Sequence, residues 1–278
     1  MGRKLFGTDG VRGVVGEVVT ADLALALGRA AVDELRRDGD DAPQVLVVRD
    51  TRESGEMLEA AIAAGIAEAG GTVLLGGVLP TPAAPLLLAR YGLDAAVVLS
   101  ASHNPYRDNG IKFFGSDGRK LSDAVEQAIE ERLERPPRRA ADVGRDRVLH
   151  GTLEDYLRAL HERFAGLDLG GLDVVLDCAN GATFRAAPEI FRRLGATVTT
   201  VADAPDGRNI NDGVGSTHVE ALAAAVAQGG HDVGFAFDGD GDRVLAVDRS
   251  GAVVDGDELL ALSALHLHGA GRLTGGGV

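Results

Sequence analysis

The sequence predicts an α/β protein made of repeated β-α-β-α-β domains, with mixed, mainly parallel sheets covered by helices on both faces. Two observations predict this class. Short apolar runs of strand length alternate with alanine- and leucine-rich runs of helical length. The same five-element pattern also occurs twice, and each time its third strand runs directly into a polar loop, at residues 100–105 and 238–243.

The first repeat opens with the apolar strand "QVLVV", and its first helix follows Ser54, which we expect to cap that helix. Its second helix carries Pro82 near the start, a favoured position for proline. Strands that are apolar throughout are typical of parallel sheets buried on both faces. The expected strand, helix, strand, helix and strand lie at residues 44–48, 54–69, 71–76, 82–92 and 94–100.

The second repeat has the same order of elements, expected at residues 172–177, 183–195, 196–201, 218–230 and 232–237. A further strand over 243–248 and an amphipathic helix over 255–271 follow it. Prolines and mixed charge in "ERPPRRAADVGRD" mark a boundary, and a helix over 152–164 comes next. We therefore predict a first domain over residues 1–150, a second over 151–252, and the start of an incomplete third over 253–278.

The composition narrows the classes of function. With 278 residues and 45% hydrophobic side chains, the chain is long enough for about two globular domains. A formal net charge of -14 argues against nucleic acid as a partner, because phosphate backbones need clustered basic residues. The single cysteine, Cys178, excludes an internal disulfide, and the N-terminal "MGRKLFGTDG" has no apolar leader, which favours the cytoplasm. No apolar run reaches the roughly 20 residues of a membrane span.

The two polar loops should face a shared cleft. In open α/β sheets, ligands bind beyond the carboxyl ends of the strands. Ser102 and Asp238 stand at equivalent positions after the third strands of the two repeats. We therefore expect these two loops to form one site.

The loop "FDGDGDR" indicates a site for a hard cation. Asp238, Asp240 and Asp242 alternate with glycines that allow backbone angles closed to bulkier residues. An EF-hand is excluded because its sixth and twelfth positions here are Arg243 and Arg249, and a strand follows instead of a helix. Three carboxylates leave coordination positions open, which suits Mg²⁺. The alternative is a solvated acidic turn.

The serine of "SASHNP" fits phosphoryl transfer better than acyl transfer. Ser102 lacks the G-x-S-x-G elbow of hydrolases, since Ser100 and Asn104 occupy the glycine positions. Opposite a three-carboxylate metal loop, it would be the covalent carrier of the phosphate. The alternative for this loop is a hydrogen-bonded turn that follows a strand.

The motifs "FGTDGVRG", "SASHNP", "DNGIKFF" and "FDGDGDR", in this order, resemble those of the α-D-phosphohexomutase superfamily, in particular its group that acts on glucosamine phosphates. "DCANGAT" and "GSTH" agree with this resemblance. It covers the whole chain, but the chain covers only the first three fifths or so of the family's length. In the family, a third domain selects the sugar and a fourth holds the distal phosphate.

The resemblance implies a set of site residues. Ser102 matches the phosphoserine, and its phosphate oxygen joins Asp238, Asp240 and Asp242 as the magnesium ligands. Lys112 matches the general acid and base, and we expect burial beside other cations to lower its pKa.

Three more residues complete the implied site. Arg12 and Arg243 match arginines that line the cleft and hold phosphate oxygens. His103 would support the phosphoserine, with a structural capping role as the alternative.

The implied activity is the interconversion of glucosamine 6-phosphate and glucosamine 1-phosphate through glucosamine 1,6-bisphosphate, in the supply of UDP-N-acetylglucosamine for the cell wall. The partners are the phosphosugar, the bisphosphate and a second copy of the chain in a homodimer, without nucleic acid or membrane. Alternatives are an enzyme for glucose or mannose phosphates and a non-catalytic fragment that binds metal and phosphate. We expect this chain alone to have negligible turnover, and its helix over 255–271 to be poorly covered.

Overall fold

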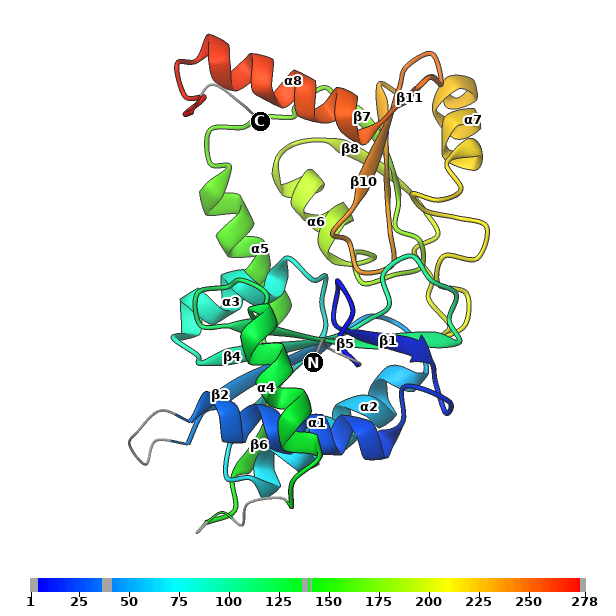
Figure 1. Ribbon diagram of the computed structural model, residues 1–278. Coiled ribbons are helices and arrows are strands. Elements are labelled where there is room, and N and C mark those ends of the chain that lie inside the picture. The colour runs from blue at the N-terminus through cyan, green and yellow to red at the C-terminus, as the bar shows by residue number, and fades with distance from the viewer. Residues whose placement is uncertain (1–4, 37–41, 137–139, 141, 276–278) are drawn as a thin grey trace.

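The computed structural model describes residues 5–36, 42–136, 140 and 142–275 of the chain. Its strands form two separate sheets, each with helices on both of its faces (Figure 1). Strands within residues 11–148 make up a six-stranded sheet, and strands within residues 173–254 make up a five-stranded sheet. The two α/β units are stacked, with helix α5 (Thr152–Arg163) between them (Figure 1).

The first sheet has the strand order β1-β5-β4-β2-β3-β6. Strands β4, β2, β3 and β6 pair in parallel, whereas β5 pairs antiparallel with both β4 and β1. The six strands are Val11–Val14 (β1), Gln44–Arg49 (β2), Thr72–Val78 (β3), Ala95–Leu99 (β4), Asp108–Gly115 (β5) and Arg145–Val148 (β6).

Alternate side chains of the central strands feed two hydrophobic cores. Val45 and Val47 of β2 pack with helices α1 (Ala21–Leu35), α2 (Ser54–Glu68) and α4 (Asp123–Leu133) on one face. Leu46 and Val48 pack on the other face with α3 (Ala83–Tyr91) and with Tyr156 of α5. Burial on both faces explains why this strand is apolar throughout.

The second sheet has the strand order β11-β10-β9-β7-β8. Val174 and Leu176 of β7 face α6 (Ala186–Arg193), whereas Val175 faces α7 (Glu220–Gly229). The five strands are Asp173–Asp177 (β7), Thr197–Val201 (β8), Val233–Phe237 (β9), Val244–Asp248 (β10) and Val253–Val254 (β11).

The two sheets repeat one topology. Strands β4-β2-β3 and β9-β7-β8 are parallel triplets in the same order, and in each the third strand of the repeat pairs antiparallel with the strand that follows it in the chain. The chain reverses its direction between β4 and β5 in the loop of Ser102, and between β9 and β10 in the loop of Asp238. The predicted fold class is therefore confirmed. The antiparallel strands β1, β5 and β11 extend the predicted triplets, so that the second sheet contains as many antiparallel as parallel pairings.

Ser54 does not cap α2: Glu53 occupies the N-cap without a side-chain bond, and Ser54 Oγ accepts a hydrogen bond from Asn109 instead. The second helix of the first repeat does begin after Pro82, as predicted. The predicted domain limits after residues 150 and 252 remain predictions.

The last helix, α8 (Gly256–Gly269), has no buried residue, which confirms that it is poorly covered. Its start is stabilised by a capping box, in which Asp255 and Glu258 each accept from the other's backbone N–H. Across the described ranges, no helix is both long enough and apolar enough to cross a membrane.

Candidate functional site

The loop of Ser102 and the loop of Asp238 meet between the two sheets, as predicted from their equivalent places. Ser102 Oγ donates a hydrogen bond of 2.5 Å to Asp238 Oδ2 across 136 positions of sequence. Both residues are fully buried. The carboxyl ends of β4 and β9 thus contribute to one site, as expected for parallel sheets.

Asp238, Asp240 and Asp242 form a cluster with the geometry of a cation site. Each offers a carboxylate oxygen, and these oxygens lie within 4.8 Å of one another. Asp240 Oδ1 is buried and, in the described part of the chain, has no hydrogen-bond partner. Because a buried carboxylate oxygen is costly without a partner, this atom fits a metal ligand. The triad could therefore hold a metal ion.

The pKa values of the cluster reflect burial and crowded negative charge. Burial and the neighbouring Asp240 raise the pKa of Asp238 to about 7. Burial and Asp240 also raise the pKa of Asp242. Burial acts in the same direction on Asp240, but the Lys112 ammonium outweighs it and lowers the pKa of that carboxyl. Like charges at this spacing favour protonation unless a cation neutralises them.

Lys112 lies on β5, is 1% exposed, and points at this cluster. Its Nζ is 2.8 Å from Asp240 Oδ2, 3.1 Å from Asp9 Oδ2 and 3.7 Å from Asp242 Oδ2. Burial acts to lower the pKa of Lys112, but these carboxylates outweigh it, so the pKa is raised. The expectation that neighbouring cations lower this pKa was wrong, because the neighbours are carboxylates.

The two glycines of the Asp238 loop are needed for different reasons. Gly241 has φ +69°, the left-handed region that favours glycine. Gly239 instead permits a close approach, since a Cβ there would lie 2.6 Å from the carbonyl oxygen of Ser102. The sequence predicted the special backbone angle at both positions, but the structure requires it only at Gly241.

The remaining predicted residues lie around the serine. His103 Nδ1 is 3.5 Å from Ser102 Oγ and 3.0 Å from Arg243 Nη1. A guanidinium can only donate, so this contact requires an unprotonated Nδ1. Burial, Arg243 and Arg12 lower the pKa of His103, which favours the neutral ring. Arg12 lies on β1 and pairs with Asp9, and its Nε is buried without a partner among the described residues.

Four residues that contact this site were not assigned a role from the sequence. Thr81 follows β3 and donates to Asp240 Oδ2 at 2.7 Å, and Asp9 contacts Lys112. Asn211 Nδ2 donates to the carbonyl oxygens of Ser102 and Asn104. Arg52 follows β2 and contacts the Ser102 loop. Thr81 and Arg52 could have been found by the strand-end rule that located Ser102.

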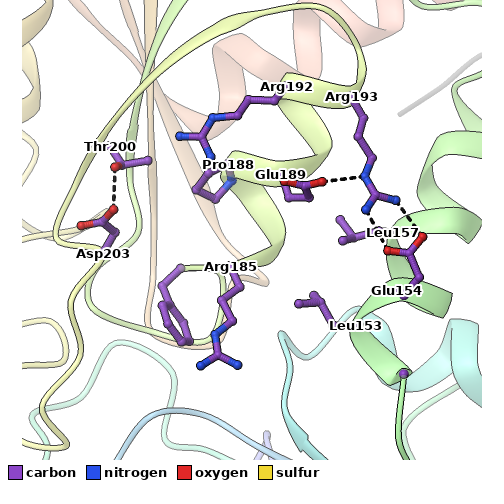
Figure 2. A pocket seen from close by; sticks show the side chains of 12 residues that line it. Leu153, Glu154, Leu157, Arg185, Pro188, Glu189, Arg192, Arg193, Thr200 and Asp203 are labelled. Carbon is purple, nitrogen blue, oxygen red and sulfur yellow. Dashed lines mark hydrogen bonds and ion pairs between the residues drawn. The ribbon is translucent and has the colours of Figure 1, made fainter.

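A separate cavity of about 550 Å³ lies between α5, α6 and the end of β8. Within it, Arg193 is held by Glu154 and Glu189, while Arg185 and Arg192 extend from the same helix region (Figure 2). None of the residues that line it belongs to the carboxylate cluster. The cavity is therefore distinct from the site around Ser102.

Comparison with known proteins identifies the family. Residues 3–139 match the family model described as phosphoglucomutase/phosphomannomutase, alpha/beta/alpha domain I, and residues 154–251 match the model of domain II. The chain belongs to the phosphoglucomutase/phosphomannomutase family. Ser102 and Lys112 lie within the first match, and the three aspartates lie within the second.

Members of this family with similar sequences and structures are known. A phosphoglucosamine mutase of Pseudomonas aeruginosa is 50% identical over 280 residues, which cover 99% of this chain and 62% of that protein. A phosphoglucomutase/phosphomannomutase family protein of Burkholderia thailandensis has a TM-score of 0.84 at 29% identity, covering 96% of this chain and 59% of that one. The chain thus spans about 62% of the length of the curated relatives that it matches.

A solved structure with lower sequence identity shares the fold. The N-acetylphosphoglucosamine mutase of Aspergillus fumigatus, solved in complex with GlcNAc-6P and magnesium, has a TM-score of 0.57 at 16% identity. The match covers 98% of this chain and 56% of that one.

Proposed function

We propose that this chain provides the phosphoserine and the metal site of a phosphoglucosamine mutase, which interconverts glucosamine 6-phosphate and glucosamine 1-phosphate. The observation that carries the proposal is the 2.5 Å contact between Ser102 Oγ and Asp238, inside a cluster of three carboxylates and a buried lysine. The 50% identity to a phosphoglucosamine mutase supports the choice of sugar. Phosphosugars are the proposed ligands, and the cytoplasm and a homodimer remain expectations.

In the proposed reaction, phosphorylated Ser102 gives its phosphoryl group to the free hydroxyl of the sugar phosphate. The bond from phosphorus to Ser102 Oγ breaks, and a bond to the sugar oxygen forms, which gives glucosamine 1,6-bisphosphate. After the bisphosphate turns over in the cleft, its other phosphoryl group returns to Ser102. The product is the isomeric sugar monophosphate, and the phosphoserine is restored.

Asp238, Asp240, Asp242 and a phosphoserine oxygen would hold Mg²⁺ at this site. Mg²⁺ would offset the negative charge that develops on the transferring phosphoryl group. Lys112 would exchange the proton of the reacting hydroxyl. Its ammonium form is now favoured by three carboxylates, so neutralising those carboxylates would lower its pKa toward the range where it gives up a proton.

Arg243, His103 and Arg12 would bind the phosphate. Arg243 lies within hydrogen-bond distance of His103, which in turn lies next to Ser102 Oγ. The planar donor fork of an arginine matches phosphate oxygens. The buried Nε of Arg12 would gain an acceptor when phosphate binds.

A half-reaction tests this proposal directly. The unphosphorylated chain is mixed with Mg²⁺ and glucosamine 1,6-bisphosphate, and peptide mass analysis follows the phosphate on Ser102 while the sugar monophosphate is quantified. We expect one phosphate per chain at Ser102 and an equal amount of monophosphate. Ser102→Ala should accept none, and phosphate located at the neighbouring Ser100 instead of Ser102 would refute the assignment of the serine. An unmodified wild-type chain would refute the proposal.

Parallel reactions with the bisphosphates of glucose and mannose test the choice of sugar. We expect glucosamine 1,6-bisphosphate to react fastest. Equal or faster transfer from another sugar would favour a phosphoglucomutase or phosphomannomutase. The negligible mutase turnover of these 278 residues alone remains a prediction, to be checked by the same assay over many turnovers.

A further inference from the structure

Arg52 is the largest fully buried side chain among the described residues, and its position is unusual for an arginine. It follows β2, and its side chain lies inside the loop that leads from Ser102 to β5. Every one of its five N–H donors has an acceptor. Nε bonds Asp50 Oδ2 at 2.9 Å, Nη1 bonds the carbonyl oxygens of Pro105 and Asp108, and Nη2 bonds those of Ser102 and Asn104.

Four of these acceptors are backbone carbonyls from residues 102–108, so this loop folds around the guanidinium. Buried carbonyl groups need donors, and here one planar cation supplies them. The three bonds with ordinary lengths measure 3.0 Å to Ser102, 2.9 Å to Asn104 and 2.9 Å to Asp108. Arg52 therefore sets the path of the loop that carries the reactive serine.

Asp50 fixes the guanidinium and also connects it to the other side of Ser102. Asp50 Oδ2 accepts from Arg52 Nε and, at 2.6 Å, from Ser100 Oγ. Ser100 Oγ in turn accepts the backbone N–H of Ser102 at 2.9 Å. The peptide groups before and after Ser102 are thus both held by one buried network. Ser102 has φ +54°, a left-handed angle that a serine rarely adopts unless its surroundings impose it.

We propose that Arg52 is a positioning residue for phosphoryl transfer at Ser102. This inference rests on the proposed function and adds a residue that touches neither sugar, phosphate nor metal. By holding four carbonyls of the loop, Arg52 keeps Ser102 in its left-handed conformation and directs Oγ at Asp238. Without it, the serine is present but no longer aligned with the carboxylate cluster.

The chemistry of arginine makes the proposal testable with a conservative change. Arg52→Lys keeps the charge, but an ammonium has three donors around one atom and cannot span four carbonyls. Arg49→Lys is the matched control. Arg49 ends the same strand and pairs with Glu56 and Glu59 of α2, away from the Ser102 loop.

The experiment is a single-turnover transfer from glucosamine 1,6-bisphosphate to unphosphorylated chain in the presence of Mg²⁺, with bisphosphate varied. We expect Arg52→Lys to lower the maximal rate constant by roughly 100-fold, the size of loss that a misplaced reacting group causes. The bisphosphate concentration at half-maximal rate and the Mg²⁺ affinity should stay unchanged. Arg49→Lys should match the wild type in all three quantities.

The rate constant of phosphoryl transfer and the fraction of chains that react distinguish a positioning role of Arg52 from a merely structural one. A variant that is partly unfolded lowers the fraction of chains that react and leaves the rate constant of the folded chains unchanged. That outcome, or a wild-type rate in a folded Arg52→Lys chain, would overturn the inference. A wild-type chain that takes no phosphate would instead overturn the proposed function, and the inference with it.

A second variant covers the case in which Arg52→Lys does not fold. Asp50→Asn keeps the shape of the side chain but removes the charge that fixes the guanidinium. We expect the rate constant to fall by roughly tenfold, the range that the loss of a charged hydrogen bond produces. An unchanged rate constant in this folded variant would also count against a positioning role for the network.

Discussion

Asp240 follows a strand of the second sheet and accepts hydrogen bonds from two residues of the first α/β unit. Its Oδ2 accepts from Thr81 after β3 and from Lys112 on β5, while its own loop follows β9. Both of these bonds go to one oxygen, which leaves Oδ1 buried and without a partner among the described residues. The carboxylate is thus held in one orientation, with one oxygen left for another ligand.

Thr81→Val tests this arrangement at the level of one hydroxyl. The change removes the donor with little change in shape, so the carboxylate of Asp240 is less firmly oriented. A group that hydrogen-bonds to a metal ligand typically contributes at least about tenfold to metal affinity. We therefore expect Mg²⁺ binding, measured by titration calorimetry, to weaken by roughly tenfold. Thr81→Ser keeps the hydroxyl and should bind like the wild type. Equal affinity in the valine variant would contradict the assignment.

The residues that could be predicted from the sequence are those at strand ends. Ser102 and the three aspartates follow apolar strands, and topology alone brings such positions together. The pKa of Lys112 could not be predicted, because its three carboxylate neighbours come from distant segments. Asn211 lies in the irregular segment before α7, and no periodicity fixes the route of such a segment. Its contact with Ser102 could therefore only be seen in the structure.

Helix α8 buries no residue, so its stability depends on local features. Leu260, Leu262 and Leu265 are more than half exposed, so packing contributes little to its stability. Its capping box is the main local feature that favours the helix. The sequence predicted this helix from its periodicity. This was possible because the features that favour the helix, its repeat and its cap, involve only residues close together in the sequence.

Asp255→Ala should therefore loosen α8 without affecting the rest of the chain. Loss of an N-cap costs about 1 kcal/mol, which in a helix without buried contacts shifts the local opening equilibrium several-fold. Hydrogen exchange of the α8 amides should speed up, while amides of β7 and β9 exchange as before. Asp257→Ala is the control, because Asp257 lies two residues later in the first turn and makes no capping bond in the described structure. Equal protection of α8 in both variants would contradict this prediction.

Strands β1, β5, β6 and β11 were the strands that the sequence did not predict. Strand β6 reads "RDRV", is exposed along its whole length, and is a strand only because it pairs with β3. Strand β5 contains Lys112, whose charge is compensated from the other sheet. Both patterns depend on partners rather than on local periodicity. Strands β2 and β4 were predictable because burial on both faces makes them apolar along nearly their whole length.

At the scale of the whole molecule, the contacts of the site join the two α/β units. Ser102 bonds Asp238, Thr81 and Lys112 bond Asp240, and Asn211 bonds the Ser102 loop. Burial and the repulsion between neighbouring carboxylates raise the pKa values of Asp238 and Asp242 in this arrangement. A bound cation should therefore stabilise the contact between the two α/β units as well as the loop of Asp238.

Mg²⁺ should raise the stability of the whole chain for this reason. A ligand that binds only the folded state, at about 100 times its dissociation constant, adds about 2.7 kcal/mol to the free energy of unfolding. Thermal unfolding monitored by circular dichroism should therefore shift upward with Mg²⁺. Asp240→Asn should shift little, because it lacks one carboxylate charge. Equal shifts in both chains would show that Mg²⁺ acts elsewhere.

The long sequence separations across the site also set the order in which it can form during synthesis. Its three central contacts join residues 159, 136 and 128 positions apart, whereas each sheet draws only on one continuous segment of the chain. Domains generally fold as units, the N-terminal one first, as the chain leaves the ribosome. The first sheet can therefore be complete while the aspartates are still untranslated. Until Asp242 has emerged, the nascent chain presents a serine and a lysine with no carboxylate cluster opposite them.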